Sequence, residues 1–188
     1  MIPPVIQTAR LVLRPLKTTD AESHMRHIND WEVTRWLGPG FPWPYPADGS
    51  EKYLARNSTD AAESLHWAIT FPEKAGDALI GVIELRPNET EGQRGFWLAR
   101  AYHNLGVMTE AIYATNDYWF DTMGRDTLHL CNARQNGASS RLKKKSGATF
   151  LAVRPGKFLD PDLTEEETWL LRAENWRHFR QNHPLPSN

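Results

Sequence analysis

The sequence predicts a single domain of the mixed α/β or α+β class, and three observations support this prediction. The chain has 188 residues, enough for one sizeable hydrophobic core. Hydrophobic residues make up 40% of it and charged residues 24%, near the averages of soluble globular domains. Apolar residues alternate in some segments and recur at helical spacing in others, in the order β, α, α, a β meander, α, β, α, β, β. Without an internal repeat, a low-complexity segment or a linker, we expect residues 1–188 to form one domain.

Charge and cysteine content narrow the possible partners and compartments. The 22 Lys and Arg residues nearly balance the 23 Asp and Glu residues, so the net charge of −1 provides no global attraction for nucleic acid or an anionic membrane. The single cysteine, Cys131, cannot form an internal disulfide, and no Cys/His pairs have zinc spacing. The opening segment has no apolar run of signal-peptide length, and nowhere do ~20 apolar residues run together. We therefore expect a cytoplasmic protein with no membrane partner and no bound metal.

The N-terminal part predicts one strand and two short helices. Apolar residues alternate over residues 10–16, which indicates a strand that stops near its proline. Thr19 and Glu22 have the spacing of a capping box and predict that a helix starts there. A second apolar stripe predicts another helix over residues 31–37.

Residues 38–49 predict an aromatic loop. This segment holds four prolines and three glycines together with Phe41, Trp43 and Tyr45. Such a composition can neither continue a helix nor fill a central strand. The polar segment that follows, residues 50–64, predicts a surface helix.

The middle of the chain predicts a β meander followed by the helix with the strongest signal. The expected strands are 66–71, 79–85 and 93–99, with a turn over residues 72–77 between the first two. Apolar residues then recur on one helical face from Met108 to Met123, and Gly124 stands where a helix end favours positive φ.

The last part of the chain predicts a helix between strands. The expected strands are 127–131, 150–153 and 168–171, and the expected helix covers residues 136–146. Trp176 and Phe179 are expected to pack either within the chain or across a dimer, so a monomer and a homodimer both stay open.

The segment from Leu98 to Ala111 is the first candidate for chemistry, because it predicts a strand, a short loop with one glycine, and a helix. The free amides of a helix's first turn bind phosphate, and a residue without Cβ lets the phosphate approach the backbone. Gly106 would be that residue. The alternative is an ordinary strand-to-helix turn, since one glycine is weak evidence.

A second candidate is the segment 127–159, which carries seven Lys and Arg residues and no Asp or Glu. Within it, a helix opens with Asn136 after a strand. The ordinary explanation is a solvated helix face. Two anion-suited features that flank one strand nevertheless suit a ligand with several phosphates.

Several stretches of the chain, in this order, resemble the GNAT acetyltransferase superfamily and its RimJ/RimL-like branch of protein N-terminal acetyltransferases. They are Thr8–Leu16 with Asp20–Glu22, Ile80–Ile83, Phe96–Leu98 with Gly106–Ala111, Asn136–Ser139 with Lys145–Gly147, and Trp169–Arg172. The resemblance implies a GNAT-like fold, with a central mixed, mostly antiparallel twisted sheet flanked by helices. It also implies direct transfer of an acetyl group from acetyl-CoA to a primary amine in a ternary complex, without a covalent enzyme intermediate.

The resemblance also implies a role for particular residues. The amides of Leu105 to Thr109, a run that includes Gly106, Val107 and Met108, would hold the pyrophosphate, with Asn104 in the same loop. The backbone of Leu98 and Ala99 would hold the pantetheine arm and polarise the acetyl carbonyl, and Asn136 would bind the pantetheine region. Lys143 and Lys144 would meet the nucleotide phosphate.

Departures from the family pattern shape the catalytic assignment. The loop has Ala101 and Asn104 where the family usually has other residues. No tyrosine follows Tyr118, which leaves Ser139, Ser140 or water to protonate the departing thiolate, with Ser139 as the candidate acid. Gln93 replaces a carboxylate that the branch often has. Glu84 is the nearest substitute base, and its alternative is an outward-facing strand carboxylate.

The acceptor side is expected to involve Glu32, Trp43 and Tyr45, although the aromatic residues can equally form a hydrophobic lid. The acceptor is either a protein N-terminus or a small amine, because the sequence does not decide between an open groove and an enclosed pocket. A second hypothesis is a coenzyme A-binding module without catalysis. A third, nucleic-acid binding through residues 134–157, lacks the interleaved aromatic residues of a single-strand platform.

Overall fold

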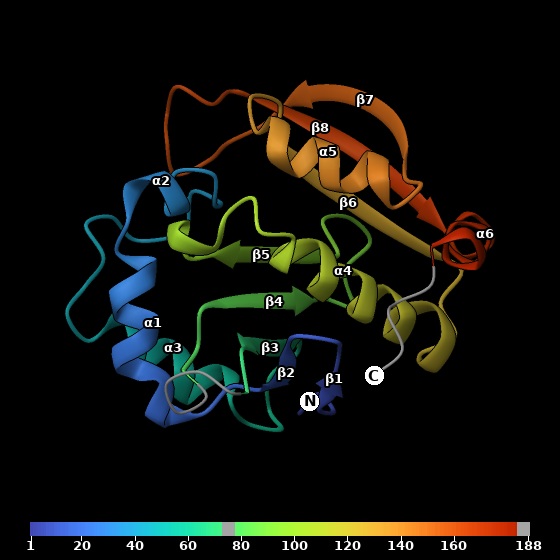
Figure 1. Ribbon diagram of the computed structural model, residues 1–188. Helices are drawn as coiled ribbons and strands as arrows, with labels where there is room; N and C mark the ends of the chain where they lie inside the picture. Colours follow the sequence, from blue (N-terminus) through green and yellow to red (C-terminus); the bar gives the residue numbers. More distant parts are fainter. Residues whose placement is uncertain (73–77, 184–188) are drawn as a thin grey trace.

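Over residues 1–72 and 78–183, the computed structural model has two antiparallel sheets with helices packed on both faces (Figure 1). The five-stranded sheet has the spatial order β1 (Ile6–Gln7), β2 (Val12–Pro15), β3 (Leu65–Thr70), β4 (Gly81–Leu85), β5 (Arg94–Leu98). The three-stranded sheet has the order β6 (Thr127–Ala133), β8 (Glu165–Arg172), β7 (Thr149–Pro155). This is the expected class of fold.

Helices connect and cover the strands. The α-helices are α1 (Ala21–Ile28), α2 (Trp31–Thr34), α3 (Gly49–Asn57), α4 (Val107–Asp117), α5 (Gly137–Lys145) and α6 (Ala173–Asn182). Short 3-10 turns, η1 (Thr18–Asp20) and η2 (Arg100–Tyr102), precede α1 and α4, and the π-helical turn η3 (Tyr118–Thr122) extends α4.

The five-stranded sheet separates two hydrophobic clusters because alternate strand residues point to opposite faces. On one face, Trp67 and Ile83 pack with Ala111 and Ile112 of α4. We call this side the α4 face. On the other, Ala68, Val82 and Trp97 pack with residues of α1 and α3, Ile28 and Leu54. We call this side the α1–α3 face.

The two sheets meet at the start of β5 and then part. The N–H of Gln93 donates to the carbonyl of His129 at 2.9 Å, and the N–H of His129 donates to Gln93 Oε1 at 2.7 Å. Beyond this junction, β5 and β6 belong to separate sheets and diverge toward their carboxyl ends (Figure 1). Gln93, the residue found in place of a carboxylate, therefore closes the narrow end of a split between the sheets.

Most elements expected from the sequence are confirmed, with four differences. The carboxylate that closes the turn before α1 belongs to Asp20, which accepts from the N–H of Lys17 at 2.8 Å, whereas Glu22 pairs with Arg26. The helix expected over residues 50–64 ends at Asn57. Two elements, β1 and α6, were not expected. Residues 73–77 of the expected turn lie outside the described residues.

Trp176 packs within the chain, since it is fully buried on α6 and its indole N–H donates to Asp117 at 2.9 Å. This settles the expectation for Trp176 in favour of an intramolecular contact. Among the described residues, no helix has the length and apolar character needed to cross a membrane. In the same part of the chain, no group of three or more His, Cys, Asp or Glu residues is arranged to hold a metal ion.

Candidate active site

The loop before α4 presents a helix N-terminus with unusual backbone geometry. Gly106 is the N-cap residue of α4 and has φ +77°, and Asn104 also adopts a positive φ of +62°. Asparagine tolerates this conformation better than most residues, so the turn forms without a glycine at position 104. No side chain caps the helix, while Val107 and Met108 are buried and anchor it. The amides of the first turn are therefore free of capping side chains.

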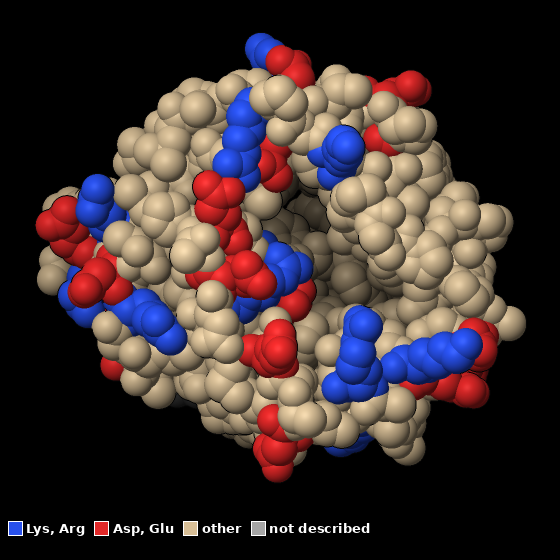
Figure 2. Space-filling model, turned by 180° about the vertical axis from the view of Figure 1, so that it is seen from behind, with Lys and Arg blue, Asp and Glu red and all other residues tan. Residues whose placement is uncertain are grey.

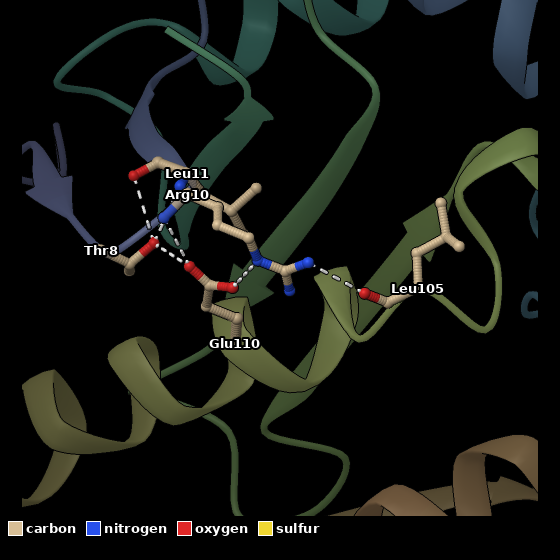
Figure 3. Close-up of polar contacts among 5 residues, drawn as sticks. All are labelled: Thr8, Arg10, Leu11, Leu105 and Glu110. Atoms are coloured by element: carbon tan, nitrogen blue, oxygen red, sulfur yellow. Dashed lines mark hydrogen bonds and ion pairs between the residues drawn. The ribbon is translucent and has the colours of Figure 1, made fainter. Parts of the chain in front are cut away.

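Arg10 ties this loop to the start of the chain (Figure 3). Its Nε donates to Glu110 Oε2 at 2.7 Å, and its Nη1 donates to the carbonyl of Leu105 at 3.1 Å. Glu110 Oε1 also accepts from Thr8 Oγ1 at 2.6 Å and from the N–H of Arg10 at 2.9 Å. A Cβ added to Gly106 would lie 3.4 Å from Arg10 Nη2. The guanidinium thus brings positive charge beside the first turn of α4.

The backbone of β5 supplies a second set of polar groups along the split. The N–H of Ala99 donates to the carbonyl of Ile80 at 2.9 Å, so this amide is engaged within the five-stranded sheet. In an antiparallel pair, successive residues direct their hydrogen-bonding groups to opposite sides. The N–H of Leu98 therefore points toward the split, while its carbonyl lies 2.8 Å from His103 Nε2. Leu98 and Ala99 were both expected to hold the pantetheine arm through their backbone. Of these two residues, Leu98 has the N–H that is directed toward a ligand in the split, because the N–H of Ala99 is bonded within the sheet.

Helix α5 contributes its own N-terminus on the β6 side of the split. Asn136 is the N-cap residue, and its side chain accepts from the N–H of Ser139 at 3.1 Å. This bond uses the Asn136 carbonyl oxygen and leaves its amide nitrogen for another partner. Ser139 is 5% exposed, and its Oγ accepts from Lys143 Nζ at 2.7 Å.

The position of Lys143 corrects one expectation. Its side chain is 2% exposed and reaches back one helical turn, so its ammonium cannot meet a nucleotide phosphate at the surface. Burial lowers the pKa of Lys143 to about 7, with a further lowering from Arg94. Lys144 is exposed and lies over the Trp169 ring at 5.9 Å, so it alone of the pair remains a surface cation.

The basic segment is neutralised in part by β8, which faces it across the three-stranded sheet. Arg134 pairs with Glu165 at 3.0 Å, and Arg154 pairs with Glu166 at 2.8 Å. These pairs spread the charge that the sequence concentrates between residues 127 and 159. They weaken the nucleic-acid hypothesis, which depended on that charge.

Glu84 lies on the α1–α3 face of β4, beside Gly95 of β5. Its Oε2 accepts from Arg86 Nη2 at 2.5 Å, and its Oε1 lies 3.8 Å from His66 Nε2. The side chain is 21% exposed and thus reachable from solvent. The arginine therefore occupies one of the two carboxylate oxygens.

The aromatic loop divides between core and surface. Tyr45 is buried, stacks on Phe41 at 5.0 Å between centroids, and contacts the position of Gly49. Trp43 is 39% exposed and lies 5.3 Å from the Trp31 ring. The lid interpretation therefore fits Tyr45, whereas Trp43 is available to a ligand.

Glu32 is exposed at the start of α2, with Oε1 3.9 Å from Arg35 Nη1. Arg35 also pairs with Asp160 at 2.5 Å, which links α2 to the segment that precedes β8. The molecule is hollowed on the side seen in Figure 2, with acidic and basic side chains on the left and lower parts of the rim and mostly uncharged residues on the right.

The comparisons with known proteins agree with this geometry. A family model described as "Acetyltransferase (GNAT) domain" matches residues 10–149. The chain belongs to the GNAT acetyltransferase family. The matched part runs from Arg10, which we call with Glu110 the clamp of the loop before α4, to the first residue of β7.

One curated relative matches the chain in sequence, and solved structures match its fold. YoaA of Bacillus subtilis, an uncharacterised N-acetyltransferase, is 25% identical over 150 residues, which cover 77% of this chain and 82% of YoaA. A GNAT acetyltransferase from Bacillus anthracis has a TM-score of 0.77 at 19% identity, covering 91% of this chain and 99% of that one. The ribosomal-protein-S5-alanine acetyltransferase of Vibrio fischeri has a TM-score of 0.74 at 14% identity, covering 93% and 99%.

Sequence reasoning missed two residues that shape the site. Arg10 belongs to the N-terminal motif, but its contact with a loop almost a hundred residues later leaves no local signal. His103 stands within the expected loop, and its contact with Leu98 could have been suspected from that proximity alone.

Proposed function

We propose that this GNAT protein transfers an acetyl group from acetyl-CoA to a primary amine. The observation that carries the proposal is the pair of helix N-termini, those of α4 and α5, on the two sides of the split between β5 and β6. A ligand with phosphates at one end and an amide-rich arm suits this arrangement, because free amides and a helix dipole favour the phosphates. Family membership supports the same cofactor.

The residues present fit the cofactor at the loop. Gly106 has no Cβ, and the space that a Cβ would fill is bordered by the Arg10 guanidinium. Amides of residues 105–109 would hold the pyrophosphate, with Arg10 adding a cation beside them. The Leu98 N–H and the amide nitrogen of Asn136 would bind the arm that lies in the split.

Acetyl-CoA supplies an acetyl thioester. The protein supplies a group that accepts a proton from the amine and a group that donates a proton to sulfur. The amine nitrogen bonds to the acetyl carbon as the carbon–sulfur bond breaks, leaving an electron pair on sulfur. The amine loses one proton on the α1–α3 face, where Glu84 or water receives it. Sulfur gains one proton from the hydroxyl of Ser139.

For the acceptor we propose an amine at the N-terminus of a protein, as in the RimJ/RimL-like branch. The hollow in Figure 2 and the exposed Trp43 support an acceptor that extends beyond its amine. The similarity to an acetyltransferase for ribosomal protein S5 supports the same class. A small-molecule amine is the competing acceptor, and it would favour an enclosed pocket.

A coenzyme A-binding module without catalysis is the second candidate function. Two observations favour it, namely the neutral Gln93 at the junction of the sheets and the pairing of Glu84 with Arg86. It predicts binding without turnover.

The test is calorimetric titration with acetyl-CoA, followed by thiol release in the presence of N-terminal peptides and small amines. We expect Gly106→Val to abolish binding, since a β-branched residue is strained at positive φ and would crowd the cradle. Gly124→Val is the matched control, because Gly124 has φ +65° with no atom within 4 Å of the Cβ position. Equal affinities for the two variants would contradict the proposed site. Binding with no release for any amine would favour the binding module.

A further inference from the structure

The interior behind Ser139 contains a buried polar cluster that the proposed function does not use. Lys143 is the cation closest to that residue, one helical turn later on α5. Its Nζ donates to Ser139 Oγ, and within residues 1–72 and 78–183 no carboxylate oxygen lies within ion-pair distance of it. A buried ammonium with one hydroxyl as its partner is poorly stabilised in its charged form.

Every element packed around Lys143 contributes to its electrostatics. Arg94 of β5 opposes its positive charge, whereas Cys131 of β6 and two β8 glutamates, Glu166 and Glu167, favour it. Glu167 accepts from Ser140 Oγ at 2.6 Å, which engages this carboxylate away from Lys143. Desolvation is the largest influence and lowers the pKa of Lys143 to about 7.

The hydrogen bond from Lys143 also determines which role the Ser139 hydroxyl can take. Because Ser139 Oγ accepts from an ammonium, its own O–H is free to donate elsewhere, and the neighbouring positive charge makes it a better donor. Within the described part of the chain, this O–H has no recorded acceptor. Ser139 stands in the first turn of α5 and is 5% exposed. Under the proposed function, the thioester sulfur would lie beside it.

We propose that Lys143 supplies, through Ser139, the proton that the departing thiolate receives. This rests on the proposed function and makes Lys143 a positioning residue that acts through Ser139. The Ser139 proton moves to sulfur as a Lys143 proton moves to Ser139 Oγ, and Lys143 ends neutral. It regains a proton from solvent when the thiol product leaves.

The acidity of the two groups suits this direction. An ordinary thiol has a pKa near ~8.5, so an ammonium whose pKa is about 7 donates to the thiolate downhill. A lysine at its usual pKa would be the weaker acid. Burial therefore converts a residue that is normally a surface cation into an acid matched to neutral pH.

The first experiment measures kcat against pH for the native protein, Lys143→Met, Ser139→Ala and the double variant. Methionine keeps the length and apolar stem of lysine without its proton. We expect native kcat to decline above pH 7, and Lys143→Met to lose this decline and fall roughly tenfold to a hundredfold at pH 7. The double variant should be no slower than the slower single variant, because the two residues act in series.

Lys145→Met is the matched control, since Lys145 is exposed on the same helix and should keep the native rate and profile. A Lys143→Met protein with native rate and pH profile would overturn the relay alone. A native protein that neither binds acetyl-CoA nor releases thiol would overturn the proposed function and the relay together.

A second readout does not depend on turnover. In protein carrying 13C-labelled lysine, the signal of the Lys143 ε-methylene should titrate near pH 7 without ligand. Coenzyme A with a free thiol should shift that titration, whereas desulfo-coenzyme A should not. The same shift with both ligands would place sulfur away from Ser139 and overturn the relay.

Discussion

The two sides of the five-stranded sheet differ in the kind of polar group that they offer to a ligand. On the α4 side, the groups available to a ligand are backbone amides, those before α4, where Arg10 holds the loop, and that of Leu98 at the edge of the sheet. On the α1–α3 face, they are side chains, and several of these are packed into a hydrophobic cluster. Backbone amides keep their chemistry whatever the side chain, so a binding site made from them tolerates departures such as Asn104. A site made from side chains changes with every substitution.

The largest effect should come from the buried half of the aromatic loop. Tyr45→Ala should lower the free energy of unfolding by about 3 kcal/mol, because it removes an aromatic ring from the α1–α3 cluster. Trp43→Ala should change stability little and instead raise the KM for the amine several-fold. Denaturant unfolding and steady-state kinetics on both variants check this contrast. Equal destabilisation would mean that both residues are core and that neither meets the acceptor.

His24 should make the α1–α3 face sensitive to acid. Burial lowers its pKa from 6.5 to about 4, more than Asp20 raises it, and its Nδ1 lies 2.8 Å from Ser50 Oγ. The unfolded chain binds a proton below pH 6.5 while the folded protein does not, so stability is full above that pH and falls as pH drops toward 4. The predicted loss over this window is about 3 kcal/mol.

The measurement for His24 is denaturant unfolding at a series of pH values, for the native protein and His24→Gln. Glutamine offers a neutral hydrogen-bonding group that does not titrate. The difference between the two proteins should shrink as pH falls from 6.5 to 4. A constant difference would show that His24 ionises normally in the folded state.

Removal of the Arg10 side chain should weaken the binding of acetyl-CoA at the loop before α4, with little change of fold. Arg10→Ala removes the bond to Leu105 and the cation beside Gly106, so affinity for acetyl-CoA should fall about tenfold to a hundredfold. Arg26→Ala is the control, because Arg26 forms only an exposed helical pair with Glu22. Calorimetric titration measures both. An Arg10→Ala protein with native affinity would mean that the loop holds its shape alone.

The smallest effect concerns the proton of the amine. Glu84→Gln should reduce kcat about tenfold, less than the usual loss of a general base, because Arg86 already occupies one carboxylate oxygen and water can take the place of Glu84. Affinity for acetyl-CoA, which depends on the other face, should not change. A loss beyond a thousandfold would identify Glu84 as the sole base, and an unchanged rate would assign the proton to water.

The sequence predicted the order of elements well because each depends on local periodicity and turn chemistry. The helix before Gly124 and the loop at Gly106 are examples, since their signals lie within a few residues. It failed where packing decides. Nothing in a run of three lysines indicates that Lys143 is buried while Lys144 and Lys145 are exposed. The pair of Arg10 and Glu110 joins residues a hundred positions apart.

The separation of Arg10 and Glu110 in the chain determines when, during synthesis, the loop before α4 can adopt its final structure. Arg10 leaves the ribosome long before Glu110, its partner in the ion pair, so the cradle at Gly106 cannot take its final form until β2 and α4 have docked on the same sheet. Ligand affinity then reports on the completed tertiary structure of this half of the molecule. A nascent chain stopped before residue 110 would contain the N-terminal motif and still be unable to retain its cofactor.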